Sequence, residues 1–540
     1  MALLSHVSTW AVGAVILFLL LRPWLLPSKQ IRRNGQRLRK APNTLPFLGN
    51  GILFMQDRQK LFTWFTKCEK AADYETLEIS VPTLPPGVVV HSPRNLDFIF
   101  RNESLFSKGD FVKSRAWDLF GRGIINADGE AWRLQRRAGA AFLSTANLRV
   151  LTEVALPRFL GEEVERLRGL ADGDAGHPGD GKGEGEVADL QEVFHEITTR
   201  LMGRMAYNME MHTSEPFTTA FDFASGATAE RFQNPLWFVT EPFTAWRFRK
   251  SVAVVKAFGR KIVASAVAER HGSERSSSSP DPKAVVSNGA DSDAEKKLDQ
   301  ISGTLINSFL DSIPDHQVVA DAALNYLSAG RDTTAQALTW TFHLLFKCPE
   351  ALDRIREEAL EVLDSVSEDM GNPLAQLTPQ VLPYTLAVFY EALRLYPPIP
   401  LEIKQLVADH PVTLPDGTVL PPDAVVVWSP WALGRSRRTW GEDADEFRPD
   451  RWLVREGGKT AMAQRPASEF PVFNGGPRSC LGKKMAEVIG VQVIAAMAVA
   501  FDFKPADGAG EGKERRERRS KTSLTLPMEG GLPVTVRRRT

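Results

Sequence analysis

One short segment near the end of the chain, FNGGPRSCLG at residues 473–482, places a cysteine in a glycine-rich loop. A thiolate that serves as a metal ligand must be shielded from protons and oxidants, and backbone N–H groups of such a loop can point at its sulfur. Gly482 lets the chain pass close to a flat macrocycle, Phe473 shields one side, and Arg478 can pair with an acidic substituent of that macrocycle. The residues that follow are expected to form a helix whose positive N-terminal dipole favours the thiolate. The segment therefore predicts that Cys480 ligates a metal held in a planar cofactor.

The other two cysteines, Cys68 and Cys348, lie far from Cys480 and from each other. The chain has three cysteines and no CxxC pair, which argues against a disulfide framework and a zinc site and fits a reducing compartment. Because lone cysteines are usually buried and inert, we expect a structural role for Cys68 and Cys348.

A second group of reactive side chains occurs in AGRDTT, residues 329–334. Gly330 has no side chain and is expected to open a helix to a diatomic ligand and water. Thr333 offers a hydroxyl and Asp332 a carboxylate, so the two can carry protons to an oxygen-binding site. The alternative is that Asp332 caps a helix beginning at ALTWTF, since aspartate is a preferred N-cap residue. Apolar residues at helical spacing upstream favour a helix that continues through the site.

The elements that must position these side chains are mainly helical. Apolar residues recur at three-to-four spacing over 187–209 and 318–346, and the second stretch is apolar on nearly all sides, as expected of a buried central helix. Sequence patterns typical of strands occur at 77–92, 412–429 and 523–536. Proline and glycine residues interrupt these stretches, as is typical of short hairpins. The sequence thus predicts a mainly α fold with small antiparallel β-sheets (α+β).

The first residues differ in composition from the rest. Residues 2–21 contain no Asp, Glu, Lys or Arg, and about 20 apolar residues suffice for a membrane-spanning helix. A run of basic residues follows, which predicts that the remainder lies on the cytoplasmic side. We therefore expect an anchor at 1–26 and a basic, proline-containing tether at 27–50. A cleaved signal peptide is the alternative, but its basic n-region and small-residue cleavage site are missing from the sequence.

No linker divides the region from residue 51 to 540, so it is interpreted as a single domain. Three low-complexity stretches, 171–186, 271–297 and 506–521, are expected to be flexible insertions because they have too few apolar residues to offset their ordering entropy. Lys plus Arg and Asp plus Glu both total 66, which argues against a nucleic-acid binder. The GHPGDGK stretch lacks the Ser or Thr of a phosphate-binding loop, and no dinucleotide site is visible.

From about Ala41 onward, the motifs resemble those of the cytochrome P-450 superfamily of haem-thiolate monooxygenases. Besides residues 473–482 and 329–334, the E-x-x-R motif of that family resembles Glu391 and Arg394, and its third partner matches Arg451. The resemblance implies a cytochrome P-450 fold after an N-terminal transmembrane helix, with haem b (iron protoporphyrin IX) as cofactor and Cys480 as axial ligand of its iron. It also implies that Glu391, Arg394 and Arg451 form a structural network beneath the haem.

The same resemblance implies further cofactor-binding residues. Trp132 and Arg136 match the W-x-x-x-R of the family and are expected to face a haem propionate, with a surface Trp–Arg stack as the alternative. Lys404 occupies a position where relatives often have arginine, and Arg478 of the Cys480 segment is expected to pair with a haem propionate. Phe473 is expected to shield the sulfur side of the haem, while Thr333 and Asp332 are the catalytic candidates.

The implied reaction inserts one oxygen atom of O2 into a lipophilic substrate and uses electrons from a separate NADPH-dependent cytochrome P-450 reductase. The motifs are most similar to those of membrane-bound fungal and plant hydroxylases of alkanes and fatty acids, and nine aromatic residues between 217 and 248 suit a substrate arriving from membrane lipids. The expected location is the endoplasmic reticulum membrane, single-pass, with a cytosolic catalytic domain. A hydroperoxide-rearranging haem enzyme and a non-catalytic haem sensor are the alternatives.

Overall fold

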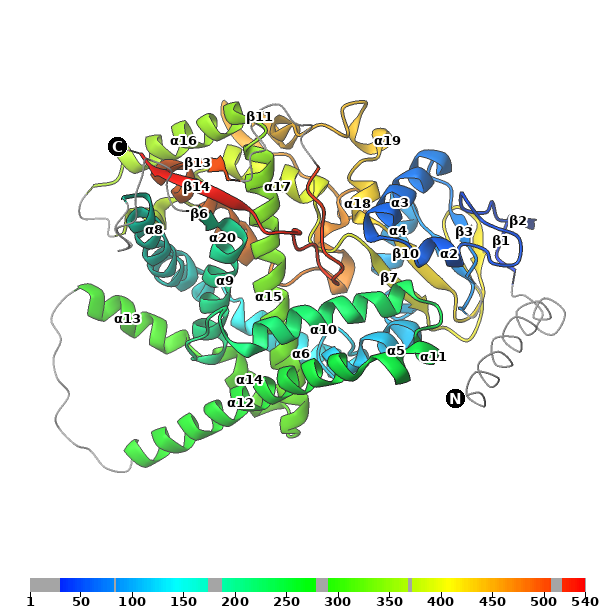
Figure 1. The fold of residues 1–540 in the computed structure, drawn as a ribbon, viewed down its shortest axis with the longest axis horizontal. Helices are drawn as coiled ribbons and strands as arrows, with labels where there is room; N and C mark the ends of the chain where they lie inside the picture. The colour runs from blue at the N-terminus through cyan, green and yellow to red at the C-terminus, as the bar shows by residue number, and fades with distance from the viewer. Residues whose placement is uncertain are drawn as a thin grey trace, which may run out of the picture.

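The computed structural model describes residues 30–81, 84–172, 187–277, 290–367, 372–506 and 517–539. The predicted fold class is confirmed in its main features, since helices dominate and the sheets are small (Figure 1). The helices up to the middle of the chain are α2 (Gly51–Phe54), α3 (Arg58–Ala72), α4 (Pro93–Arg101), α5 (Gly109–Phe120), α6 (Gly129–Phe142), α7 (Thr145–Val150), η1 (Leu151–Ala155), α8 (Leu156–Asp172), α9 (Leu190–Tyr207), α10 (Pro216–Gln233), α11 (Trp237–Thr244), α12 (Trp246–Ser277), α13 (Ala290–Ile301) and α14 (Thr304–Ser312).

The second half contains the long central helix and the segments that carry the cysteine loop. These elements are α15 (His316–Leu345), α16 (Pro349–Asp364), η3 (Pro373–Gln376), α17 (Pro383–Leu395), α18 (Pro430–Leu433), α19 (Arg437–Trp440), η4 (Pro449–Trp452), η5 (Pro471–Phe473), η6 (Gly476–Arg478) and α20 (Lys483–Ala500).

Helix α15 passes through the centre of the molecule (Figure 1). It begins at an N-cap, Asp315, whose side chain accepts a hydrogen bond from the N–H of Gln317, and it continues without a break through residues 329–334. The N-cap interpretation of Asp332 is therefore wrong. Because α15 is apolar on nearly all sides, it can pack against α9, α12, α17 and α20 at once.

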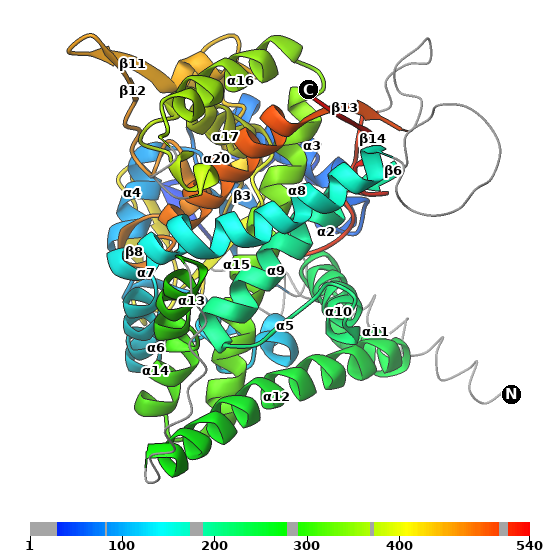
Figure 2. The same cartoon turned by 90° about the vertical axis from the view of Figure 1, so that its left-hand side faces the viewer.

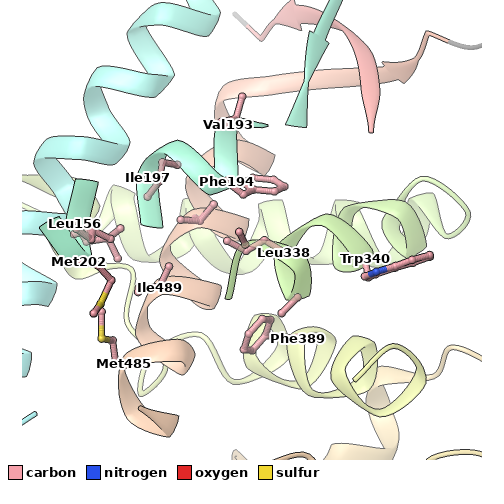
Figure 3. Close-up of a cluster of buried hydrophobic side chains, with 14 of the residues drawn as sticks. Leu156, Val193, Phe194, Ile197, Met202, Leu338, Trp340, Phe389, Met485 and Ile489 are labelled. Atoms are coloured by element: carbon pink, nitrogen blue, oxygen red, sulfur yellow. The ribbon is translucent and has the colours of Figure 1, made fainter. Parts of the chain in front are cut away.

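The hydrophobic core lies where these helices meet. Figure 3 shows side chains of α9, α15, α17 and α20 directed toward one another, among them Phe194, Leu338, Phe389 and Ile489. Helix α12 runs along one edge of the molecule and packs against α10, as Figure 2 shows. The core thus fixes α15 relative to α17 and to α20, the helix that directly follows the cysteine loop.

Four small sheets flank the helices. Their strand orders are β2-β1-β9-β8, β3-β4-β10-β7-β5, β11-β12 and β13-β14-β6. The strands are β1 (Arg32–Arg33), β2 (Gln36–Arg37), β3 (Leu77–Ile79), β4 (Gly87–Val89), β5 (Phe106–Ser107), β6 (Val187–Asp189), β7 (Glu402–Leu406), β8 (Val412–Thr413), β9 (Thr418–Leu420), β10 (Val425–Trp428), β11 (Leu453–Glu456), β12 (Lys459–Met462), β13 (Phe501–Pro505) and β14 (Pro533–Arg538).

Two details of the β structure differ from the sequence prediction. The pairing of β10 with β4 is parallel, so the largest sheet is mixed and not antiparallel throughout. Residues 523–536 do not form a hairpin: β14 pairs with β13 and β6, strands that precede it by tens or hundreds of residues. Proline and glycine residues interrupt strands and so indicate where they end, but long-range packing decides which strands pair.

The N-terminal predictions concern residues that are only partly described. The expected anchor at 1–26 lies outside the described residues, and no helix among the residues that the structure describes is both long and apolar enough to cross a membrane. The expected tether is visible from residue 30, where β1 pairs with β9 and β2 pairs with β1. The indole N–H of Trp64 also donates to the carbonyl of Pro42. This part of the tether is therefore docked on the folded domain.

The expected insertions are also described only at their edges. Residues 271–277 and 290–297 continue into α12 and α13, so the described ends of the second stretch are helical. Near the end of the third stretch, Ser520 forms a β-bridge with Met528, which holds the returning chain on the domain. Residues 173–186, 278–289 and 507–516 of the three stretches lie outside the described part.

A buried ion-pair network joins α17 to the chain segment that follows α18. The Glu391 carboxylate accepts hydrogen bonds from Nε and Nη2 of Arg394, both at 2.7 Å, and from Nε of Arg451 at 2.9 Å. The indole of Trp452 and the backbone N–H of Arg448 donate to the same carboxylate. Arg394 in turn donates to the carbonyls of three residues, Gly434, Ala444 and Glu446.

Replacing Arg394 by leucine is expected to lower the free energy of unfolding by about 3–5 kcal/mol, because the buried Glu391 carboxylate loses its principal cation. Urea denaturation followed by circular dichroism measures the loss. The matched control is Arg437→Leu, whose ion pair with Glu442 is exposed at both ends and should change stability by less than about 1 kcal/mol. Equal denaturation midpoints for Arg394→Leu and the unchanged protein would contradict a stabilising role for the network.

Candidate active site

A large internal cavity lies between α15 and the cysteine loop and has a volume of about 540 Å³. Residues of both predicted motifs line it, including Thr333 and Asp332 from α15 and Phe473, Arg478 and Cys480 from the loop. Trp132, Arg136 and Lys404 line the same cavity. The structure thus brings all eight predicted site residues, which are spread over more than three hundred positions in the sequence, around one space.

The cysteine loop is held in shape by tight backbone packing. Gly476 has a φ of +62°, and a Cβ at this position would lie 2.0 Å from the carbonyl oxygen of Phe100 in α4. Only glycine fits this left-handed conformation and close approach. The N–H of Cys480 donates to the carbonyl of Phe473 at 2.7 Å, which closes the loop directly before the sulfur. These constraints direct the Cys480 side chain into the cavity.

The environment of the Cys480 sulfur contains opposing electrostatic influences. Burial raises the pKa of the thiol, while backbone N–H groups of Gly482 and Lys483 and the positive charge of Arg136 act to lower it. The N–H groups belong to the start of α20, whose dipole places partial positive charge at the sulfur. A bound metal cation would add a much stronger stabilisation of the thiolate. The loop is therefore suited to a thiolate that becomes stable when a metal is bound.

Lys404 provides a test of whether a haem fits the cavity. Its side chain is almost completely buried, and its Nζ has no hydrogen-bond partner among the described residues. Burial, with a smaller contribution from nearby Lys108, lowers the pKa of Lys404 to about 8. An unpaired buried ammonium is costly unless an anion joins it. A haem propionate has the required charge, so the residues present fit a haem ligated by Cys480.

Two further predicted residues, Trp132 and Arg136, lie beside the loop. Arg136 donates from Nη1 to the carbonyl of Ser479 at 2.7 Å, and its guanidinium lies 5.6 Å from the ring of Trp132. Trp132 is buried. The alternative of a surface Trp–Arg stack is therefore wrong, because the pair lines the cavity and contacts the cysteine loop.

Arg478 has carboxylate partners within the protein. It donates from Nη2 to Glu103 and to Asp128, both at 2.7 Å, and from Nη1 to the carbonyl of Ala127. Its guanidinium also lies 4.4 Å from the ring of Trp132. The sequence prediction gave Arg478 a propionate partner and missed Glu103 and Asp128, since no local pattern connects these residues to position 478. The two carboxylates orient Arg478 at the cavity wall.

Residues of the AGRDTT segment, among them Gly330 and Thr333, line the cavity. A Cβ on Gly330 would lie 2.5 Å from Sδ of Met202, so the missing side chain allows α9 to approach α15 closely. The expectation that Gly330 opens the helix to a diatomic ligand and water stays a prediction. Thr333 lines the cavity and donates its hydroxyl to the carbonyl of Ala329 at 2.7 Å, a bond that loosens the helix locally.

Asp332 belongs to a buried charged cluster that the sequence analysis did not identify. Its Oδ1 accepts a hydrogen bond from Nη1 of Arg331 at 2.8 Å and lies 3.9 Å from Nδ1 of His195. The same Arg331 nitrogen is 3.7 Å from Oδ1 of Asp222, whose side chain reaches solvent. Burial, opposed by Arg331, raises the pKa of Asp332 to about 7. A carboxyl group that exchanges its proton near neutral pH is well suited to proton transfer.

Comparisons with known proteins agree with this arrangement. The family described as cytochrome P450 has a sequence model that matches residues 40–530. Cytochrome P450 94A1 of Vicia sativa is 27% identical over 514 residues, which cover 92% of this chain and 90% of that protein. Cytochrome P450 CYP94D109 of Paris polyphylla is 29% identical and covers 83% of this chain and 85% of its own length. Cytochrome P450 monooxygenase cyp1 of Mycosarcoma maydis is 29% identical, with 92% of this chain and 74% of that protein covered.

Replacing Cys480 by alanine is expected to abolish the red-shifted Soret band that a thiolate-ligated haem shows when reduced and bound to carbon monoxide. Cys68→Ala and Cys348→Ala are the matched controls and should keep the band, because Cys68 is buried away from the cavity and Cys348 does not line it. Absorption spectra of the three purified variants measure the outcome. A normal band in Cys480→Ala would show that another residue ligates the iron.

Proposed function

The chain belongs to the cytochrome P450 family and is a haem-thiolate monooxygenase, and from this premise we propose that it hydroxylates aliphatic chains of fatty-acid or alkane type. We further propose haem b as its cofactor and a separate NADPH-dependent reductase as its electron donor. The substrate class is inferred from the cavity, which is mostly apolar and has Cys480 and Thr333 in its wall. Apolar lining residues include Val112, Ala116, Phe120, Phe221, Phe232 and Leu393.

The aromatic residues between 217 and 248 contribute to this proposal in different ways. Phe221 and Phe232 line the cavity, whereas Phe217 stacks on Phe258 at a centroid distance of 4.4 Å within the core. Phe243 and Trp246 are 86% and 71% exposed, respectively. The stretch therefore combines cavity lining, core packing and exposed aromatic surface, which is compatible with a lipophilic substrate that enters from a membrane.

The chain and its cofactor contribute separate parts of the chemistry. When bound, haem supplies the activation of O2 and the transfer of one oxygen atom to a C–H bond. Cys480 supplies the thiolate, and Lys404 and Arg136 supply positive charge for the propionates. The apolar cavity wall excludes water and orients the substrate. Asp332 takes up protons near neutral pH, and the Thr333 hydroxyl can exchange its helical hydrogen bond for one to a water in the cavity.

The location in the endoplasmic reticulum membrane is also a proposal. It rests on the uncharged sequence from residue 2 to 21 and on the basic residues that follow. The exposed side chains of Phe47, Phe243 and Trp246 are compatible with a domain that touches a membrane surface. With this orientation the catalytic domain is cytosolic and meets a reductase in the same membrane.

The alternative of a hydroperoxide-rearranging haem enzyme keeps the fold but requires neither O2 nor a reductase. The presence of both Asp332 and Thr333 in the cavity wall favours the monooxygenase, because proton delivery is needed only when O2 is reduced. A non-catalytic haem sensor would likewise not need an acid with a pKa near 7 at this position.

Replacing Thr333 by alanine is expected to preserve binding of haem and carbon monoxide but to lower the product formed per NADPH, with the difference released as hydrogen peroxide. Without the hydroxyl, a less well-placed water supplies the proton. Thr341→Ala is the control, because its hydroxyl makes the same bond to the fourth residue before it but does not line the cavity. Equal coupling in Thr333→Ala and Thr341→Ala would remove Thr333 from the catalytic residues.

Replacing Asp332 by asparagine is expected to slow turnover and to remove the decline of the rate above about pH 7, since only the protonated carboxyl can donate a proton.

Purified holoenzyme is expected to show a shift of its Soret band when titrated with medium- and long-chain aliphatic compounds, because a substrate displaces water from the cavity. Turnover of the same compounds should require O2, NADPH and an added reductase. Acids, alcohols and alkanes of ten to eighteen carbons form a suitable panel, with aromatic compounds and terpenoids for comparison. The absence of a shift with every aliphatic compound would contradict the proposed substrate class, and turnover of a hydroperoxide without NADPH would favour the rearranging enzyme.

A further inference from the structure

One buried cation in the cavity wall has no acidic partner among the described residues. Arg58, in the first turn of α3, is 6% exposed and lines the cavity. Its Nη1 donates to the carbonyl of Lys521 at 2.6 Å, and its guanidinium lies 5.0 Å from the ring of Phe62. Neither contact neutralises its charge. Burial lowers the pKa of Arg58 to about 9, so the side chain is still positively charged at neutral pH.

Other buried arginines of the described chain have their charge or their donors satisfied. Arg231 pairs with Asp118 and Glu241, and Arg394 pairs with Glu391. Arg435 has no carboxylate partner, but it donates to two backbone carbonyls, packs on the ring of Trp431 and lies away from the cavity. Arg58 differs from all of these because it makes a single hydrogen bond to the described residues and lines the cavity.

The cations of the cavity form two groups. Arg136 and Lys404 lie near the cysteine loop, where they fit the propionates of the haem. Arg478 is paired with Glu103 and Asp128, and Lys108 is paired with Glu402 at 3.4 Å. Arg58 contacts a different part of the wall, formed by α3 and by residues 521–525 at the end of the third insertion and directly after it. Because its contacts are with these segments and not with the loop, the haem propionates do not explain its charge.

We propose that Arg58 binds the carboxylate of an aliphatic acid, so that the substrate is a fatty acid held at its acidic end and not an alkane. A guanidinium can donate two parallel hydrogen bonds to a carboxylate, and such a bond is stronger in a buried, apolar site than in water. The apolar wall of the same cavity accepts the chain. This inference rests on the proposed function and makes its substrate class more specific.

The arrangement has a consequence for the position of oxidation. An acid held at Arg58 has one end fixed, so the length of its chain determines which carbon lies nearest the haem. A neutral chain of equal length can slide along the apolar wall, because dispersion contacts have little directional preference. Fatty acids should therefore give a narrower set of products than aliphatic alcohols of the same length.

The test uses full-length holoenzyme and two probes of equal length, dodecanoate and its neutral analogue dodecanamide, titrated by the Soret shift. The unchanged protein should bind dodecanoate about 10-fold or more tightly than dodecanamide, as expected for a charge-assisted pair. Arg58→Gln should weaken dodecanoate binding by about 10- to 100-fold and leave dodecanamide binding within about 3-fold. Arg58→Lys should retain part of the preference, because the charge remains but the two-pronged geometry is lost.

The matched control is Lys108→Gln, which removes a positive charge from the same cavity but from a side chain already paired with Glu402. It should keep the preference for the acid. Equal weakening of both probes by Arg58→Gln would overturn the proposal and assign Arg58 a structural role in holding residue 521. Equal binding of both probes by the unchanged protein would overturn the carboxylate site alone, whereas binding of neither would also contradict the aliphatic substrate.

Discussion

The structure depends first on the buried carboxylate of Glu391. An unpaired carboxylate at this depth would be prohibitively costly, and the protein satisfies it with Arg394, Arg451, Trp452 and a backbone N–H. These donors come from α17 and from the chain around η4, so satisfying one group joins two parts of the fold. On the neighbouring turns of α17, Phe389 and Leu393 reach the cavity, and Tyr390 packs on Phe470 just before the cysteine loop. The network thereby fixes the base on which the Cys480 loop rests.

Three side chains around the cavity have a charge, or need one, that the described residues do not balance. Each of them marks a place where a ligand can bind. The thiol of Cys480 has a pKa raised by burial and requires a cation to become a stable thiolate. Lys404 has a buried ammonium for which the described residues supply no partner, and it requires an anion. Arg58 has the same need at a different part of the wall. A haem satisfies the first two, and an acidic substrate satisfies the third. An unpaired buried charge destabilises the protein, so a ligand that pairs with it gains free energy of binding.

The cluster around Asp332 shows how a catalytic side chain is adjusted by neighbours from other helices. Arg331 is adjacent in the sequence, but His195 comes from α9 and Asp222 from α10. Burial raises the pKa of Asp332 to about 7, the positive charge of Arg331 opposes this rise, and the negative charge of Asp222 adds to it. The exposed Asp222 lies next to Arg331, and Arg331 donates to Asp332. These charged groups therefore extend from the solvent to the cavity wall.

The sequence by itself determined the features that depend on local geometry. The glycine-rich loop at 473–482 marks Cys480, the central helix is apolar on nearly all sides, and E-x-x-R spacing places Glu391 and Arg394 on one face of α17. Such patterns are readable because a helix or a tight turn relates residues a few positions apart. They were sufficient to predict the mainly helical fold and the family.

Only the tertiary structure decided which distant groups meet. It gave Arg478 the partners Glu103 and Asp128, placed Met202 against Gly330 and paired β10 with β4 in parallel. It also placed Arg58 in the cavity wall with no acidic partner in the described part of the chain. No periodicity in the sequence encodes these contacts, because they arise when whole helices pack and the chain between them is long. The residue types at the site are therefore visible in the sequence, whereas their charge partners follow from packing.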